Sequence, residues 1–358
     1  MKRTRAGRGG HALPDDGWII GLDIGATAVR GAVLARSGGG HALPSIVLQS
    51  LGHVDLPLGA VVDGVVKDGL AVTSAVRHLA HETGFSSRHV VLGTANQQVV
   101  VRDLRMPNLP PEQMRAALPF QARELVALPK DEALLDFIPL GQVDAATNTV
   151  AGLLVAAPRL PVLAAVRAVE RAGLTVAKVD LSSLAALRFL AQEDLRAEAI
   201  VDLGAHLTSI VIHGGGVPKI VRTVAHGGEE LTYRLADRAD LSLADAELAK
   251  CNEGMTGEGD IPTILSEGIR PLLAEIRSSL HFFASTNPDT PLGRVSLTGG
   301  AAALPGLAAL LASQHGITVE VVPPYQHIET RWSTHMRQTG SGVSASAVAA
   351  GLAMGAVA

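Results

Sequence analysis

Two stretches with the same layout decide the fold: "WIIGLDIGATAVRGAVLA" (Trp18–Ala35) near the start of the chain and "AIVDLGAHLTSIVIHGGG" (Ala199–Gly216) in its second half. Each is an apolar run that ends in Asp-x-Gly, followed by a short loop and a second β-branched run. Glycine turns come at 38–40 and 214–216, and a third apolar run follows each turn. Because β-branched runs bounded by glycine are typical of strands, both stretches predict strand, loop, strand, turn and strand. The same unit is therefore predicted to open two lobes of one protein.

Helical patterns alternate with the strands around this duplication. Leu160–Ala172 has apolar residues at three-residue spacing and is followed by Gly173, a typical helix stop. Further helices are predicted over Ser182–Gln192, Ser242–Lys250 and Pro271–Ala284. Strands mixed with crossover helices predict an α/β fold.

The middle of the chain departs from this alternation. His89–Arg105 has the pattern of extended chain, Glu112–Leu125 that of a helix, and Leu134–Leu140 and Thr149–Ala156 those of two strands. We therefore expect an inserted α+β subdomain of strand, helix, strand and strand over residues 89–178. The remaining boundaries are expected at 1–16 for a flexible basic tail, at 17–88, 179–198 and 330–358 for the first lobe, and at 199–329 for the second lobe.

Composition limits the functions open to the chain. Its 358 residues are 47% hydrophobic, which is enough for two packed lobes. With 30 Lys and Arg against 34 Asp and Glu the net charge is −4, so no broad basic surface for nucleic acid is expected. The single cysteine, Cys251, cannot form an internal disulfide, which suits a reducing cytoplasm. The charge-free segment Gln338–Ala358 is rich in Ala and Gly, so we expect a buried helix rather than a membrane span.

The two Asp-x-Gly loops are candidate phosphate-binding loops. Glycine allows the backbone of 23–27 and 202–206 to approach a polyphosphate closely. Asp23 and Asp202, each at the end of a strand, would hold Mg²⁺ through water, because Mg²⁺ keeps much of its hydration shell. One such loop alone is typical of an ordinary hairpin turn. Two copies in matching strands favour a clamp around the phosphates of a nucleotide.

Two later segments come in the order that a nucleotide clamp needs. Gly227 and Gly228 open a helix after a strand, where free backbone N–H groups would favour an anion. Glu247 and Lys250 lie three residues apart on one face of a predicted helix. Taken in isolation, this second pair is more simply explained as a solvated ion pair.

A third segment, "VSLTGGAAALPG" (Val295–Gly306), is a predicted strand followed by a glycine pair and a helix start. Without side chains, Gly299 and Gly300 would let a flat adenine ring pack against the backbone. Other local signatures are absent from the sequence, namely G-x-x-x-x-G-K-[ST], G-x-G-x-x-G, H-E-x-x-H and G-x-S-x-G.

This series of motifs resembles the ATPase fold shared by actin, sugar kinases and heat-shock chaperones. The resemblance implies an actin-like (ribonuclease-H-like) two-lobed fold that binds ATP with Mg²⁺, and a connecting helix between the lobes at 180–192. It implies phosphate contacts from Gly25, Ala26, Thr27, Arg30, Gly204, Ala205, His206, Gly227 and Gly228. It likewise implies adenosine contacts from Glu247, Lys250, Gly299, Gly300, Ala301 and Leu304, and metal contacts from Asp23 and Asp202. No catalytic residue can be assigned.

Within this superfamily the chain is similar to the type IV pilus assembly protein PilM family. The similarity lies in "PFQARELVALPKDEALLDFIPLG" (Pro119–Gly141), "VDLSSLAALRFL" (Val179–Leu190) and "GGEELTYRLA" (Gly227–Ala236). The inserted subdomain also resembles that of the cell-division protein FtsA. FtsA ends in a basic amphipathic helix, whereas no Lys or Arg follows Arg337 here, which disfavours FtsA.

The sequence departs from the family pattern at several loop positions. Arg30 stands where the family usually has Lys, and His206 stands where a small hydroxyl residue is expected. Ser182 and Ser183 lie where relatives tend to place a Glu or Gln that orients the attacking water. These changes are expected to preserve nucleotide binding better than fast hydrolysis.

The resemblance also implies a function and a partner. We expect a cytoplasmic, ATP-binding component of the type IV pilus inner-membrane assembly platform, recruited to the inner face of the membrane by partners without direct insertion. It would bind the cytoplasmic N-terminal segment of a PilN-like single-span membrane protein near the inserted subdomain, and contact other platform proteins. Two alternatives remain open: a small-molecule kinase of the same fold, for which Asp202 is the only strong candidate base, and a filament-forming actin- or FtsA-like protein.

Overall fold

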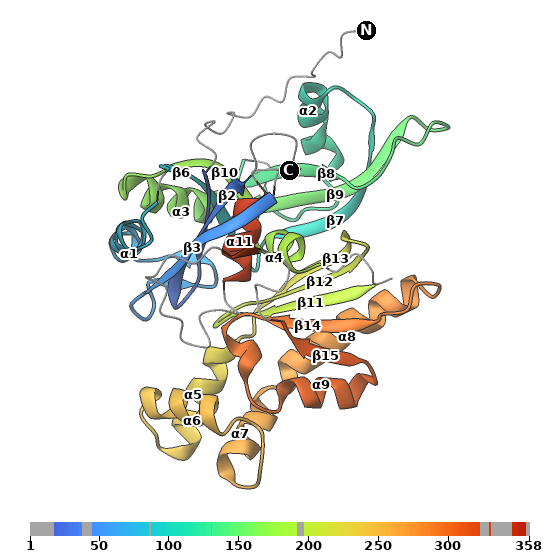
Figure 1. Ribbon diagram of the computed structural model, residues 1–358. Coiled ribbons are helices and arrows are strands. Elements are labelled where there is room, and N and C mark those ends of the chain that lie inside the picture. The colour runs from blue at the N-terminus through green and yellow to red at the C-terminus, as the bar shows by residue number, and fades with distance from the viewer. Residues whose placement is uncertain are drawn as a thin grey trace.

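The structure, a computed structural model, describes residues 18–37, 45–85, 87–129, 131–191, 197–322, 329–330 and 346–355 (Figure 1). The predicted basic tail at 1–16, the glycine turn at 38–40 and residues 338–345 and 356–358 of the charge-free segment lie outside the described residues. Two mixed sheets make up the body of the molecule, and a smaller sheet lies beside them.

The first sheet has the strand order β10-β6-β1-β2-β3-β16. Its strands are β1 (Trp18–Ile24), β2 (Ala28–Ser37), β3 (Ser45–Asp55), β6 (His89–Thr94), β10 (Thr175–Leu181) and β16 (Glu329–Thr330). β1, β2 and β3 form an antiparallel meander, whereas β6 runs parallel to β1, and β10 runs parallel to β6.

The second sheet repeats this plan in the order β13-β12-β11-β14-β15. Its strands are β11 (Glu198–Leu203), β12 (Thr208–Gly214), β13 (Val217–Val224), β14 (Arg294–Thr298) and β15 (Thr318–Val321). Again the first three strands are antiparallel, whereas β14 runs parallel to β11, and β15 runs parallel to β14. The predicted α/β fold with two equivalent lobes is therefore confirmed.

The inserted unit is a third sheet of order β7-β9-β8, with one helix packed against it. Its elements are β7 (Val100–Pro107), α2 (Pro111–Gln121), β8 (Ala133–Pro139) and β9 (Thr149–Pro158). In Figure 1 this unit lies at the end of the molecule opposite helices α5 to α7.

The inserted unit is narrower than the predicted range 89–178. β6 and β10 are strands of the first sheet, and helix α3 (Arg159–Arg171) packs into the first-lobe core. An apolar strand pattern does not say which sheet the strand joins, so the sequence could not separate β6 from β7. In the second lobe the equivalent connection between two parallel strands holds only η1 (Gly300–Ala303) and α9 (Leu307–His315).

The remaining helices cover the sheets. α1 (Gly69–Glu82) packs in the first lobe. The second lobe carries α5 (Gly228–Ala239), α6 (Leu243–Asn252), α7 (Asp260–Gly268) and α8 (Arg270–Thr286). Ser242 caps α6, because its Oγ accepts a hydrogen bond from the backbone N–H of Asp245 at 3.1 Å.

The C-terminal helix α11 (Ala347–Met354) lies beside the first sheet and the connecting helix α4 (Ser182–Leu190), as Figure 1 shows. Its small side chains allow close approach, because a Cβ on Gly351 would lie 1.8 Å from the carbonyl oxygen of Ala185. Seven of its residues are buried, so the predicted buried Ala-rich helix is confirmed for its described part. Within the described ranges, none of the helices combines the length and the apolar character that crossing a bilayer requires.

Two cations hold the C-terminal end of α11. Arg188 Nη1 donates to the carbonyl oxygen of Gly351 at 2.7 Å, and its Nη2 donates to Asp180 at 3.0 Å. Lys178 Nζ donates to the carbonyl oxygen of Gly355 at 3.1 Å. Positive side chains at this end satisfy the last helical carbonyls and interact favourably with the helix dipole.

We expect Arg188→Met to lower the free energy of unfolding by about 2 kcal/mol, because it deprives Asp180 and a helix-end carbonyl of their closest partner. Urea denaturation measures this loss. Arg222→Met is the matched control, since it breaks an ion pair with Glu275 at 2.9 Å in which both side chains are over a third exposed. That control should lose less than about 1 kcal/mol. Equal losses in the two variants would contradict an anchoring role for Arg188.

Candidate functional site

A cavity of about 750 Å³ lies where the two lobes meet. This volume is in the range of small-molecule binding sites. The two Asp-x-Gly loops face it from opposite lobes, and α5, α6 and the loop after β14 form its second-lobe wall. Every site residue predicted from the sequence lines the cavity except Gly227. The lining set is Asp23, Gly25, Ala26, Thr27, Arg30, Asp202, Gly204, Ala205, His206, Gly228, Glu247, Lys250, Gly299, Gly300, Ala301 and Leu304.

The two loops are built in the same way. The N–H of Gly25 donates to the carbonyl oxygen of Ala28 at 3.0 Å, and the N–H of Gly204 donates to that of Leu207 at 2.9 Å. Each loop therefore closes with the same backbone hydrogen bond, which joins residues three positions apart in the connection between the first two strands of the sheet. The duplication of the sheets extends to the loops that face the cavity.

Asp23 and Asp202 place two carboxyl groups close together at the base of the cavity. Burial raises the pKa of Asp202 to about 6, the charge of Asp23 adds to the rise, and Arg30 opposes it. Burial also raises the pKa of Asp23, again against the attraction of Arg30. Like charges in a poorly solvated place favour the neutral form of each acid. A bound cation would remove this repulsion.

The side chains present fit a hydrated magnesium ion with a polyphosphate. Within the described residues, no three His, Cys, Asp or Glu side chains gather into a metal-binding group. Two carboxylates suit Mg²⁺, which takes its other ligands from water and phosphate oxygens. Among the described residues, Arg30 Nε is buried without a hydrogen-bond partner. A phosphate oxygen would supply that partner.

The start of α5 is bound to the second loop. The N–H of Gly228 donates to the carbonyl oxygen of Gly204 at 2.9 Å, and the N–H of Glu229 donates to that of Ala205 at 3.0 Å. A Cβ on Gly227 would lie 2.2 Å from the same Ala205 oxygen. These two N–H groups are thus not free for an anion, which differs from the sequence-based expectation. The glycine pair lets the helix dock on the loop and fixes the shape of the loop.

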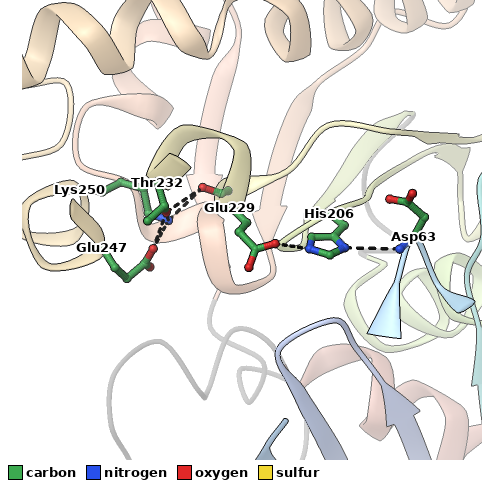
Figure 2. Close-up of polar contacts among 7 residues, drawn as sticks. Asp63, His206, Glu229, Thr232, Glu247 and Lys250 are labelled. Carbon is green, nitrogen blue, oxygen red and sulfur yellow. Dashed lines mark hydrogen bonds and ion pairs between the residues drawn. The ribbon is translucent and has the colours of Figure 1, made fainter. Parts of the chain in front are cut away.

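Lys250 is the centre of a buried network that joins α5 and α6 (Figure 2). Its Nζ donates to the carbonyl oxygen of Gly228 at 3.0 Å, to Thr232 Oγ1 at 2.7 Å and to Glu247 Oε2 at 2.7 Å. Lys250 is only 7% exposed, so the pair is not the solvated ion pair that was the simpler interpretation. A lysine has three donors, and all three are engaged within the protein.

Glu247 is the more accessible member of this network. Burial raises the pKa of its carboxyl, but hydrogen bonds from Lys250 and Thr232 outweigh this and leave the pKa below its ordinary value. Its side chain is half exposed and lines the cavity. A charged carboxylate held in this position can accept hydrogen bonds from hydroxyl groups of a ligand.

The glycine pair after β14 divides into two roles. Gly299 has a φ of 91°, and a Cβ there would lie 2.4 Å from the carbonyl oxygen of Leu203. The backbone conformation at position 299 therefore requires glycine. A Cβ on Gly300 would meet no atom within 4 Å. Gly300 is the position of the pair at which a side chain would enter the cavity.

His206 has both ring nitrogens engaged. Its Nδ1 accepts a hydrogen bond from the backbone N–H of Asp63 at 3.4 Å, and its Nε2 contacts Glu229 Oε2 (Figure 2). A neutral imidazole has one acceptor and one donor nitrogen, so Nε2 carries the proton and donates to Glu229. In this arrangement His206 has no free donor for a phosphate, although its ring lines the cavity.

Some lining residues were missed at the sequence level. Thr232 and Tyr233 follow Gly228 within the first turn or two of α5, so helical spacing from the glycine pair was a usable signal. His53 lies opposite Arg30 in the β2–β3 register, which only the pairing of the strands reveals. Val348 of α11 reaches the cavity from the far end of the chain, and no local pattern indicated it.

Comparison with known proteins gives consistent results. The chain matches the family model described as "Type IV pilus assembly protein PilM" over residues 21–357. It is similar to a chain of the PilM-PilN type IV pilus biogenesis complex, with a TM-score of 0.82, 28% identity, and 95% of this chain and 98% of that chain covered. Ethanolamine utilization protein EutJ from Carboxydothermus hydrogenoformans shares the fold at a TM-score of 0.54 and 17% identity, covering 96% and 92% of the two chains. In sequence the chain is also similar to cell division protein FtsA from Streptococcus pneumoniae, at 23% identity over 361 residues, 87% of this chain and 76% of that protein.

Proposed function

The chain belongs to the type IV pilus assembly protein PilM family, and we propose that it binds MgATP between its lobes as a cytoplasmic component of the pilus assembly platform. The observation that carries the nucleotide part is the cavity between two duplicated loops, with Asp23 and Asp202 at its base and Arg30 beside them. Magnesium would be held through water by the two carboxylates, and the phosphates would lie along the two loops. Isothermal titration calorimetry with ATP and Mg²⁺ tests the proposal. A wild-type protein without measurable affinity would overturn it.

The adenosine part would lie against the second-lobe wall. Glu247 offers a carboxylate oxygen to ribose hydroxyls, and Lys250 holds that carboxylate in place instead of contacting the ligand. The exposed backbone at Gly300 offers a flat surface to the base. The nucleoside would thereby be contacted by helices α5 and α6 and by the loop after β14.

Hydrolysis is expected to be slow. Ser182 and Ser183, at the start of α4, are 5% and 6% exposed, and neither is a carboxylate that could orient water or accept its proton. We expect a turnover far below about 10 per second, the middle of the range for enzymes. A coupled phosphate-release assay on protein freed of contaminating ATPases measures it. A rate near that value would contradict the prediction of slow hydrolysis.

A PilN-like protein is the proposed partner, because the structurally similar PilM chain comes from a PilM-PilN complex. We place its short N-terminal segment near the inserted unit. Large apolar side chains are exposed on this unit, namely Phe120 at 74%, Val143 at 42% and Leu125 at 39%. Exposed apolar side chains of this kind can anchor a protein partner. Contacts with other platform proteins are proposed on the same grounds of family membership.

Recruitment by the partner gives a direct prediction. Expressed alone, the protein should stay in the supernatant after high-speed centrifugation, because the described part of its apolar C-terminal helix is buried in the fold. Co-expression with a PilN-like single-span protein should move it to the membrane fraction. Fractionation followed by immunoblotting measures both states. Recovery of the protein alone in carbonate-washed membranes would contradict the prediction.

A surface variant makes this test specific. Phe120→Ser should weaken binding of a synthetic PilN N-terminal peptide by about tenfold in fluorescence anisotropy, since apolar anchors dominate peptide interfaces. Leu248→Ser is the matched control, because Leu248 is 61% exposed on the second lobe. Equal effects of both variants would remove the support for the inserted unit as the docking place.

A further inference from the structure

A short hairpin of the first lobe lies beside the cavity and contacts the second lobe. It consists of β4 (Val61–Val62), a two-residue Asp63-Gly64 turn and β5 (Val65–Val66), and is called the 61–66 hairpin below. Asp63 has a φ of 52° and Gly64 a φ of 76°, the backbone of a tight turn between two short strands. The backbone N–H of Asp63 donates to Nδ1 of His206, which belongs to the second-lobe loop (Figure 2).

His206 is itself held from the second-lobe side. Its Nε2–H donates to Glu229 in the first turn of α5, and the side chains of His206 and Glu229 are 19% and 17% exposed. The N–H of Glu229 is in turn bonded to Ala205, next to His206 in the loop. The imidazole is therefore fixed in both position and tautomer, and it presents its acceptor nitrogen to the hairpin.

The other side of the hairpin is bonded to the chain that enters the inserted unit. Asn96 Nδ2 donates to the carbonyl oxygen of Asp63 at 2.9 Å, and Asn96 Oδ1 accepts from the N–H of Gln98 at 2.8 Å. Asn96 is 4% exposed, and a Cβ on Gly64 would lie 1.7 Å from the carbonyl oxygen of Ala95. Four residues after Asn96 the chain becomes β7, the first strand of the inserted unit.

We propose that His206, the 61–66 hairpin and Asn96 form a latch that couples occupancy of the cavity to the inserted unit. Asp63 is the shared element, because its N–H binds the second-lobe loop and its carbonyl binds Asn96. A ligand bound against the loop at 202–206 would stabilise the position that His206 already holds, and through His206 the hairpin and the start of β7. This inference rests on the proposed nucleotide site and adds to it a regulation of partner binding. Coupling of this kind needs one element whose state both sites bias.

Hydrogen–deuterium exchange on the full-length protein tests the latch, with and without 1 mM ATP and Mg²⁺ in about twofold excess as the probe. In the wild type, MgATP should slow exchange at 23–30 and 299–304, and also at 61–66 and 96–101. In His206→Ala the slowing should no longer extend to 61–66 or to 96–101. Without nucleotide, the same variant should speed exchange at 61–66 by about five- to tenfold, which corresponds to the free energy of about one hydrogen bond.

Two further variants keep the test decisive. His226→Ala is the matched control, because His226 Nδ1 contacts Glu230 Oε2 at 2.9 Å on the same helix start but stays within the second lobe. It should leave exchange at 61–66 unchanged. Asn96→Ala leaves the cavity lining intact, so MgATP affinity and slowing at 61–66 should persist while slowing at 96–101 is lost.

The outcomes separate the latch from the nucleotide proposal. If MgATP slows exchange around the cavity and His206→Ala leaves the slowing at 61–66 in place, the latch is wrong and the nucleotide site stands. If MgATP slows nothing in the wild type, the nucleotide site fails. In that case the latch is judged by the nucleotide-free comparison, and it is also wrong if His206→Ala and His226→Ala exchange alike at 61–66.

Discussion

Gly300→Leu is expected to reduce MgATP affinity by at least about 100-fold, a loss of about 2.8 kcal/mol of binding free energy. Gly300 lines the cavity, and a Cβ there meets no atom within 4 Å, so the new side chain would occupy ligand space without colliding with the protein. Calorimetric titration measures the affinity, and urea denaturation checks that the fold is kept. The neighbouring Gly299 is a poor choice for this test, because its φ of 91° and its contact with Leu203 make any side chain disruptive.

The matched control is Gly141→Leu. A Cβ on Gly141 also meets no atom within 4 Å, and Gly141 lies after β8, outside the cavity lining. This control should bind MgATP as tightly as the wild type. If Gly300→Leu bound MgATP with unchanged affinity, the adenosine position proposed beside the loop after β14 would be wrong.

Much of the fold could be predicted from the sequence because the fold is duplicated. The same Asp-x-Gly unit appears twice, and the structure confirms that Trp18–Ile24 and Glu198–Leu203 open sheets that share one strand order, to which the first sheet adds β16. The predicted family is confirmed as well, by a match that covers residues 21–357. What could not be predicted is which sheet each strand of the middle region joins, since a strand pattern does not identify the partner strand, and β6 and β7 follow one another closely in the chain.

The predicted site residues gather around one cavity, but the roles of some depend on contacts that a sequence does not show. The glycine pair at 227–228 predicts an anion-binding helix start, whereas the N–H groups of Gly228 and Glu229 donate hydrogen bonds to carbonyl oxygens of the neighbouring loop. The spacing of Glu247 and Lys250 predicts a surface pair, whereas Thr232 and Gly228 of another helix complete a buried network. In both cases the deciding partner is about 15 or more residues away in the chain, beyond the reach of local patterns.

Asp202→Asn should stabilise the ligand-free protein while weakening its affinity for MgATP. The pKa of Asp202 is raised from 3.8 to about 6 in the folded protein, so the folded state binds a proton more tightly than the unfolded state in that interval. As the pH rises from about 4 to about 6, deprotonation of Asp202 therefore lowers the free energy of unfolding. This penalty is fully present above that pH window. At 1.36 kcal/mol per pKa unit the penalty is about 3 kcal/mol at most, and less where cavity water solvates the carboxylate.

The variant should thus be more stable than the wild type at pH 7.5, by up to about 3 kcal/mol, and equally stable near pH 4. Urea denaturation at the two pH values measures the difference. Asp289→Asn, at an exposed aspartate outside the cavity, should change stability little at either pH. The same substitution at 202 removes one of two carboxylates available to Mg²⁺, so we expect MgATP affinity to fall at least about tenfold. A variant that loses stability at pH 7.5, or that keeps wild-type affinity, would show that Asp202 is a structural residue and not a strained carboxylate kept for a cation.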